Sequence, residues 1–178
     1  MMATTINQAE ARPASYPAKP IDLTLPAAAL DAAMIWQRIE AYIAYRYTPR
    51  AVVWIVEGCG EWFPPLAPAT ISATEVWSQA AVWETAILDA APLGGFYLPA
   101  TGPYRFTASV GAGDVPAAVA EAFRRLAEHL AAVKSNVMPG VREEHVDGIG
   151  SSIFDAAAVA KALQNSGAAD LLRSYRRV

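Results

Sequence analysis

The stretch from Asp114 to Lys134 constrains the fold more than any other part of the sequence. Its apolar residues recur at steps of three and four, which places them on one stripe of a helix that must face a core. Asp114 is predicted to cap this helix, and Pro116 fits in a first turn because an N–H there has no partner within the helix. The stripe comprises Val115, Val119, Phe123, Leu126, Leu130 and Val133.

A second helix is predicted from Leu25 to Tyr47. Thr24 is a suitable N-cap, Pro26 fits the first turn, and Pro49 disfavours helical geometry in the residue before it. Its expected inner face carries Met34, Ile35, Ile39, Tyr42, Ile43 and Arg46, with Trp36 beside it.

Residues 50–111 change in character, because Val, Ile, Trp, Tyr, Phe, Thr, Pro and Gly dominate there. This composition is typical of strands and turns. The alternation in the last predicted strand places Tyr104, Phe106, Ala108 and Val110 on one face. The predicted strands are Val52 to Glu57, a hairpin of Thr70 to Ser78 with Ala81 to Thr85, Phe96 to Leu98, and Tyr104 to Val110.

These patterns predict an α+β fold. A helical core, made of two long helices and C-terminal helical segments, would carry a small inserted antiparallel β-sheet and extended terminal arms. The expected division is an N-terminal arm over residues 1–20, a core domain over 21–134 that includes the β region 50–111, and a linker with a C-terminal docking segment over 135–178. The arm has no apolar periodicity, so we expect it to lie on another chain.

The C-terminal part is predicted to begin with a connector from Ser135 to Gly150. A weak, Ala-rich helix should then run from Ser152 to about Asn165. The final GAADLLRSYRRV is too short to be a stable isolated helix. We therefore expect it to insert into a groove of a partner, and its deletion, over residues 168–178, to leave the fold intact.

Composition narrows the classes of function. Of the 178 residues, 54% are hydrophobic and only 17% are charged, which permits a sizeable core and favours oligomers. A net charge of −3 argues against a dedicated nucleic-acid binder, although DNA can pass nearby without being gripped. The single cysteine, Cys59, fits a reducing compartment. The longest strongly apolar run, Ala51 to Val56, is too short to span a bilayer, so no membrane partner is expected.

No arrangement of residues predicts catalysis, a cofactor or a metal ion. Gly111-Ala-Gly113 is better interpreted as a strand-to-helix turn than as a nucleotide-binding turn, since Asp114 would repel a phosphate. The acidic group Glu143, Glu144, His145 and Asp147 is predicted to be a solvated linker, and His129 lies elsewhere on a helix. Packing is the favoured role of Trp54, Trp62, Trp77 and Trp83, and a stacking platform for bases or carbohydrate is the alternative.

Three features in this order resemble the head–tail connector, or adaptor, family of long-tailed bacteriophages (siphophages) and gene transfer agents. They are IEAYIAYRYTPR running directly into AVVWIVEG, then VPAAVAEAFRRLAEHLAAVK after the β region, and the terminal LLRSYRRV. The resemblance covers roughly residues 25–134 and the last eight residues.

The resemblance implies a non-enzymatic virion protein that is assembled in the bacterial host cytoplasm. Members of this family form a ring, usually a dodecamer, between the portal protein and the stopper or tail-completion protein, and DNA passes through the lumen without sequence recognition. The C-terminal segment docks on the portal. By similarity, the portal-docking candidates are Leu171, Leu172, Arg173, Tyr175, Arg176 and Arg177.

Two alternatives to the adaptor remain open at this point. The first is another neck protein, either a stopper or a tail terminator. The second is a small bacterial ligand-binding domain or enzyme that uses the Trp-rich sheet.

Overall fold

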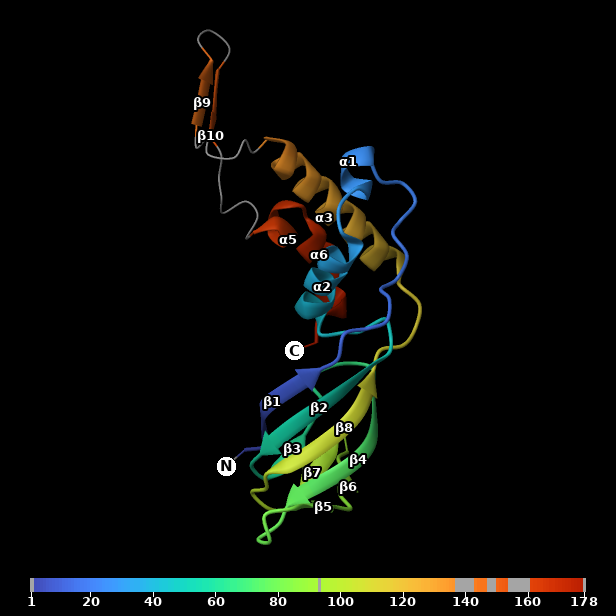
Figure 1. The fold of residues 1–178 in the computed structure, drawn as a ribbon, viewed down its shortest axis with the longest axis vertical. Coiled ribbons are helices and arrows are strands. Elements are labelled where there is room, and N and C mark those ends of the chain that lie inside the picture. The colour runs from blue at the N-terminus through green and yellow to red at the C-terminus, as the bar shows by residue number, and fades with distance from the viewer. Residues whose placement is uncertain (1, 93, 137–142, 147–149, 154–160, 178) are drawn as a thin grey trace. The chain divides into compact units, whose positions relative to one another are not determined.

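A computed structural model describes residues 2–92, 94–136, 143–146, 150–153 and 161–177 (Figure 1). The chain folds into two compact units. Unit 1 comprises Met1–Tyr16 and Ala44–Asp114, and unit 2 comprises Pro17–Ile43 and Val115–Val178. Helices and antiparallel sheets are both present, so the predicted α+β class is confirmed.

Unit 1 holds a five-stranded antiparallel sheet in the order β1-β2-β8-β4-β5. The alternation predicted for residues 104–110 is confirmed, because Tyr104, Phe106, Ala108 and Val110 are all buried. The hairpin of β4 with β5 is confirmed as well. The bounds are β1 Thr4–Glu10, β2 Arg50–Glu57, β4 Ala69–Trp77, β5 Trp83–Thr85 and β8 Tyr104–Val110.

A second antiparallel sheet of unit 1 has the order β3-β7-β6, with β3 Gly60–Trp62, β6 Asp89–Ala90 and β7 Phe96–Leu98. Its residues share the core of the larger sheet: Trp62 stacks on Phe106 with ring centroids 4.1 Å apart, and it meets Trp54 edge-on at 5.8 Å. Trp54 and Trp62 therefore hold the two sheets together.

The first residues of the chain pair within their own unit, whereas the sequence predicts an extended arm that lies on another chain. Thr4–Glu10 forms β1, which pairs with β2 along the edge of the sheet. Its side chains are exposed or half-buried, so no apolar pattern marked it in the sequence. Unit 1 is thus assembled from two segments that are separated in the chain by Pro17–Ile43 of unit 2.

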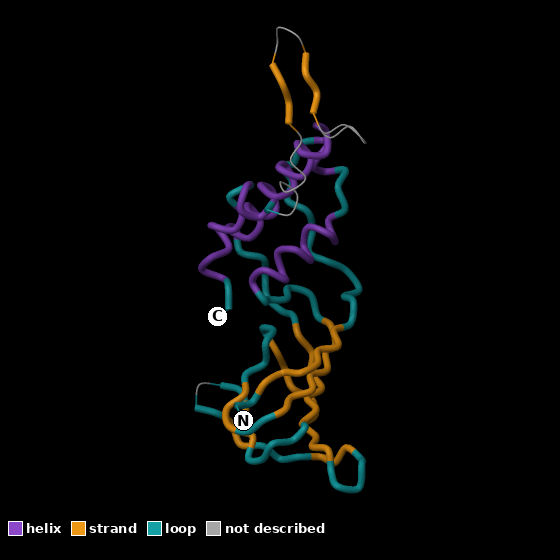
Figure 2. Tube along the Cα trace, turned by 90° about the vertical axis from the view of Figure 1, so that its left-hand side faces the viewer, coloured by secondary structure: helices purple, strands orange, loops and turns teal. Residues whose placement is uncertain are grey.

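Unit 2 is helical in its best-packed part, shown in purple in Figure 2. α3, Ala117–Asn136, buries Val119, Phe123, Leu126 and Leu130, which confirms the predicted stripe. Asp114 does not cap this helix, because Val115 precedes Pro116 and the helix begins only at Ala117. On the outer side, Arg124 and then Arg125 hydrogen-bond Glu121 and lower its pKa to about 2.

The predicted helix from Leu25 to Tyr47 is divided into α1, Leu25–Ala28, and α2, Ala32–Ile43. The break has a local cause: Asp31 Oδ1 accepts a hydrogen bond from the Ala33 amide at 2.9 Å and starts a new helix. The end is also earlier than predicted, since Ala44 has a φ of 55°. Trp36 is buried against Phe123, with ring centroids 4.9 Å apart.

The C-terminal region departs most from the predictions. Glu143–Val146 (β9) pairs with Gly150–Ile153 (β10), so the expected connector contains a strand and Ser152 does not begin a helix. Two short helices follow, α5 Ala162–Asn165 and α6 Ala168–Leu172, and then a 3-10 turn, η1, Arg173–Tyr175. Among the described residues, no helix combines the length and apolarity needed to cross a bilayer.

Candidate interaction surfaces

The C-terminal segment is anchored in its own unit. Ala168 and Leu172 are fully buried, and α6 packs against α3 and α2. The predicted insertion into a partner's groove therefore does not hold for Ala168 and Leu172, because the short helix is stabilised by packing within its own unit. Deletion of residues 168–178 would remove two core side chains, so we no longer expect it to leave the fold intact.

The six docking candidates separate into an inner and an outer group. Leu172 lies in the core and Leu171 is half-buried, whereas Arg173, Tyr175, Arg176 and Arg177 are exposed. Arg173 forms an exposed ion pair with Asp170 at 3.5 Å. The Arg176 guanidinium lies over the Tyr42 ring at 5.4 Å, and the Arg177 amide donates to the Ile43 carbonyl at 3.3 Å. The backbone is thus held while the cationic side chains face outward.

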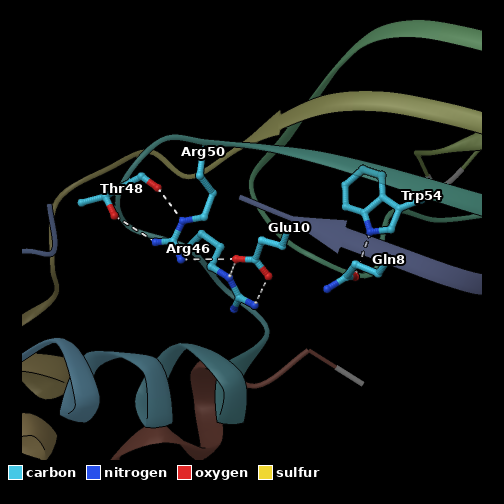
Figure 3. Close-up of polar contacts among 6 residues, drawn as sticks. All are labelled: Gln8, Glu10, Arg46, Thr48, Arg50 and Trp54. Carbon is cyan, nitrogen blue, oxygen red and sulfur yellow. Dashed lines mark hydrogen bonds and ion pairs between the residues drawn. The ribbon is translucent and has the colours of Figure 1, made fainter. Parts of the chain in front are cut away.

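A second surface with several polar contacts is the β2 edge of unit 1, where β1 lies. The buried Trp54 donates its indole N–H to Gln8 Oε1 at 2.8 Å (Figure 3). The buried Trp62 donates its indole N–H to Thr5 Oγ1 at 2.9 Å. Both donors belong to core side chains, and a buried indole N–H needs an acceptor. β1 supplies both acceptors.

The end of β1 is held by charge. Glu10 accepts from Arg46 Nε at 2.6 Å and Nη2 at 2.9 Å, and from Arg50 Nη1 at 3.3 Å (Figure 3). Burial alone would raise the pKa of Glu10, but the hydrogen bond and charge of Arg46, together with Arg50, hold that pKa below its ordinary value. Arg46 and Arg50 are 8% and 7% exposed, so the carboxylate neutralises nearly buried charges.

The tryptophan side chains of the β region differ in exposure, as the docking candidates do. Trp54 and Trp62 are core residues and offer no stacking face to a ligand. Trp77 is 42% exposed and meets Trp83 edge-on at 5.1 Å. Arg105 covers the Trp83 ring at 4.6 Å and forms a bidentate pair with Glu75. The ring face of Trp83 is thus already covered on one side by this cation.

The remaining chemical candidates give no assembled site. His129 lies half-buried on α3, and its Nε2 atom has no hydrogen-bond partner among the described residues. Glu143, Glu144 and His145 lie in β9, and Asp147 lies outside the described residues. Within the described part of the chain, no three His, Cys, Asp or Glu side chains converge as a metal site would require. Gly111 occupies a turn where a Cβ would overlap the Thr48 carbonyl, which explains that glycine by packing.

Comparisons with known proteins give only distant similarity. No protein-family model matches the chain, and no curated protein matches it. It is similar to a chain in the neck of the native GTA particle computed with C12 symmetry, at 17% identity and a TM-score of 0.43, over 83% of this chain and 80% of that one. It is also similar to a chain in the virion of the native gene transfer agent (GTA) particle, at 16% identity and a TM-score of 0.45, over 100% and 96%.

A third similar chain belongs to the neck of the empty GTA particle computed with C6 symmetry, at 16% identity and a TM-score of 0.42, over 100% of this chain and 96% of that chain. Similarity at this level assigns neither a family nor a role.

Proposed function

We propose that this protein is a non-enzymatic head–tail adaptor of a phage or phage-like particle. Copies of the chain would form a ring of twelve subunits, the number that the sequence resemblance implies, between the portal and the stopper or tail-completion protein. DNA would pass through the lumen without being read. The protein would be assembled in the bacterial host cytoplasm and would reside in the virion.

One observation carries the proposal: the C-terminal segment presents exposed cations on a buried anchor. Leu172 fixes α6 in the core of unit 2, and Arg173, Tyr175 and Arg176 follow directly on the outside. A rigid support lowers the conformational entropy that a docking segment loses on binding. Arginine and tyrosine are the residue types that concentrate binding energy at protein interfaces, and arginine pairs with carboxylates through two parallel hydrogen bonds.

Burial decides which of the six docking candidates we include in the proposed contact with the portal. Leu172 is excluded as a direct contact in this conformation because it is fully buried. We therefore assign the docking role to Arg173, Tyr175, Arg176 and Arg177, with Leu171 at their margin. The weakly acidic composition, with a net charge of −3, suits a channel wall that must let DNA slide past.

The test is charge reversal at the segment without loss of the core. The double variant Arg173→Glu and Arg176→Glu is mixed with purified portal rings, and decoration is scored by negative-stain imaging. The matched control is Lys134→Glu with Lys161→Glu, two exposed cations elsewhere in unit 2. Loss of decoration only in the arginine variant, with an unchanged circular dichroism spectrum, supports the docking assignment.

Normal decoration by the arginine variant would remove the docking assignment. Failure of the wild-type protein to bind portal rings at all would favour another neck protein, such as a stopper or a tail terminator.

A further inference from the structure

We propose that the β2 edge of unit 1 is a strand-binding slot, and that in the assembled protein it holds the N-terminal strand of a neighbouring copy. The proposal builds on the ring described above and names the contact that would link its subunits. β1 would be the ligand, and the slot would be the β2 edge with its projecting donors.

The slot is built by residues that also pack on other parts of unit 1. Trp54 and Trp62 are part of the core between the two sheets, and their indole N–H groups point to the edge where β1 lies. Arg46 and Arg50 are nearly buried at the end of the same edge. Two indole and two guanidinium groups thus donate to β1, in addition to the backbone of β2, and Arg50 also donates to Thr48 Oγ1.

The ligand fits these donors by polar contacts alone. Thr5, Gln8 and Glu10 accept from the two indoles and the two guanidinium groups, while their neighbours Ile6 and Asn7 are exposed. At the other end, a Cβ on Gly58 would overlap the Met2 carbonyl, so the glycine leaves room for the strand to approach. Recognition is therefore specific in sequence and register.

The strand contributes little to the core of its own unit. Each of its side chains is exposed or half-buried, and none belongs to the buried core residues. No helix or strand is formed by residues 11–24, which follow it. Residues 11–16, which follow β1, also belong to unit 1: the Ala11 amide donates to the Ala51 carbonyl at 2.9 Å, and the Arg50 guanidinium lies over the Tyr16 ring at 5.5 Å, so exchange must replace these contacts.

Exchange between copies then depends on proximity. The strand of a neighbour makes the same hydrogen bonds as the chain's own strand, so the slot cannot distinguish them. When identical copies are held side by side, the effective concentration of the neighbour's strand rises and exchange adds a link between subunits at little cost.

Cys59 offers a direct test, because it is the bridge partner of Met2. Neighbouring strands lie ~4.8 Å apart, within the Cα separation of ~4.4–6.8 Å that a disulfide spans. A donor chain, Met2→Cys with Cys59→Ser, has its thiol only on the strand. The wild-type chain has its thiol only beside the slot. A disulfide between the two is favoured when the strand of one copy occupies the slot of another, and a donor with its thiol outside the strand measures the cross-linking that arises by chance collision.

The two full-length chains are co-expressed with different tags, purified together and mildly oxidised, and cross-linked heterodimers are measured on non-reducing gels. The control donor carries Ile21→Cys with Cys59→Ser, which places the thiol at an exposed position outside the strand. We expect heterodimers from the strand donor at several times the control level.

Heterodimers no more abundant than those of the control would overturn strand exchange. A single chain with Met2→Cys that closes only on itself would overturn it as well. The assay needs no portal, so its outcome is distinct from the docking test. Rings that bind portals but cross-link only within each chain would contradict strand exchange and agree with the adaptor proposal. Copies that cross-link to one another but do not bind portals would support strand exchange and contradict the adaptor proposal.

Discussion

The ion cluster at the end of β1 gives a sharp prediction for Glu10→Gln. This change keeps the size of the side chain and removes its charge, which leaves the guanidinium groups of Arg46 and Arg50 nearly buried beside a neutral amide. Removing one partner of a buried ion pair costs about 3–5 kcal/mol. Glu10 keeps 20% of its side chain exposed, and Arg50 also donates to Thr48 Oγ1 at 2.9 Å. We therefore expect a loss of about 2–3 kcal/mol at pH 7.

The pH dependence follows from the sign of the shift. Burial acts to raise the pKa of Glu10, but the hydrogen bonds and charges of Arg46 and Arg50 outweigh it. The pKa of Glu10 in the folded protein is therefore below its ordinary value of 4.5. A carboxyl whose pKa is lowered by folding stabilises the fold above its unfolded pKa, and that contribution is lost as the pH falls through the folded value. The difference between wild type and Glu10→Gln should therefore shrink below about pH 4.5.

The measurement is urea unfolding followed by tryptophan fluorescence at pH 7 and pH 3. Four of the five tryptophans, all except Trp36, belong to unit 1, so the signal reports mainly the unit that contains the cluster. Glu61→Gln is the matched control, because Glu61 is exposed in the same unit and its loss should change stability by less than about 0.5 kcal/mol. A loss for Glu10→Gln below that size at pH 7, or one that persists unchanged at pH 3, would refute the reasoning.

Two further predictions concern unit 2. Leu126→Ala should lower the free energy of unfolding by ~2–5 kcal/mol, because it opens a cavity at a fully buried site, and calorimetry with Leu25→Ala at an exposed site as control checks this. An unchanged melting temperature would remove α3 from the core. Glu128 accepts from the Thr24 amide at 2.8 Å and from its hydroxyl at 2.6 Å, so Glu128→Gln should speed hydrogen exchange at that amide. The Thr24 hydroxyl and then its amide lower the pKa of Glu128, so protonation of Glu128 at acid pH should also reduce the protection of this amide in the wild type. Equal exchange rates at the Thr24 amide in wild type and Glu128→Gln at neutral pH would contradict this prediction.

Long periodic patterns predicted the helices and strands well, because one face of each such element is buried in the core and the other faces water. α3 and β8 are the clearest examples, since each buries the residues that its period selects. The break in the first predicted helix depends on a single competing cap: the Asp31 carboxylate binds the Ala33 amide and starts α2 afresh. A hydrophobic pattern does not register such a contact, because the residues on either side of it remain apolar.

β1 could not be found from periodicity, since TTINQAE buries no side chain in the core and is held by backbone and polar contacts. The sequence did contain an indirect signal. Buried tryptophans need acceptors for their indole N–H groups, and Trp54 and Trp62 find them in Gln8 and Thr5, far away in the chain. The buried tryptophans thus indicate that acceptors are required, but they do not indicate which segment of the chain supplies them.

Leu171 and Leu172 show the opposite difficulty. Their pattern indicates an apolar face but does not say whether that face meets the chain's own core or a partner, and Leu172 turns out to be buried in unit 2. β1 thus completes the sheet of unit 1 and Leu172 the core of unit 2. For contacts with other chains we propose the exposed C-terminal groups and, by exchange between copies, β1 itself. The C-terminal groups are cations, whose contacts weaken in salt, whereas strand pairing depends on backbone hydrogen bonds that salt affects much less. The two ends would therefore make contacts of different physical kinds, which experiments can separate.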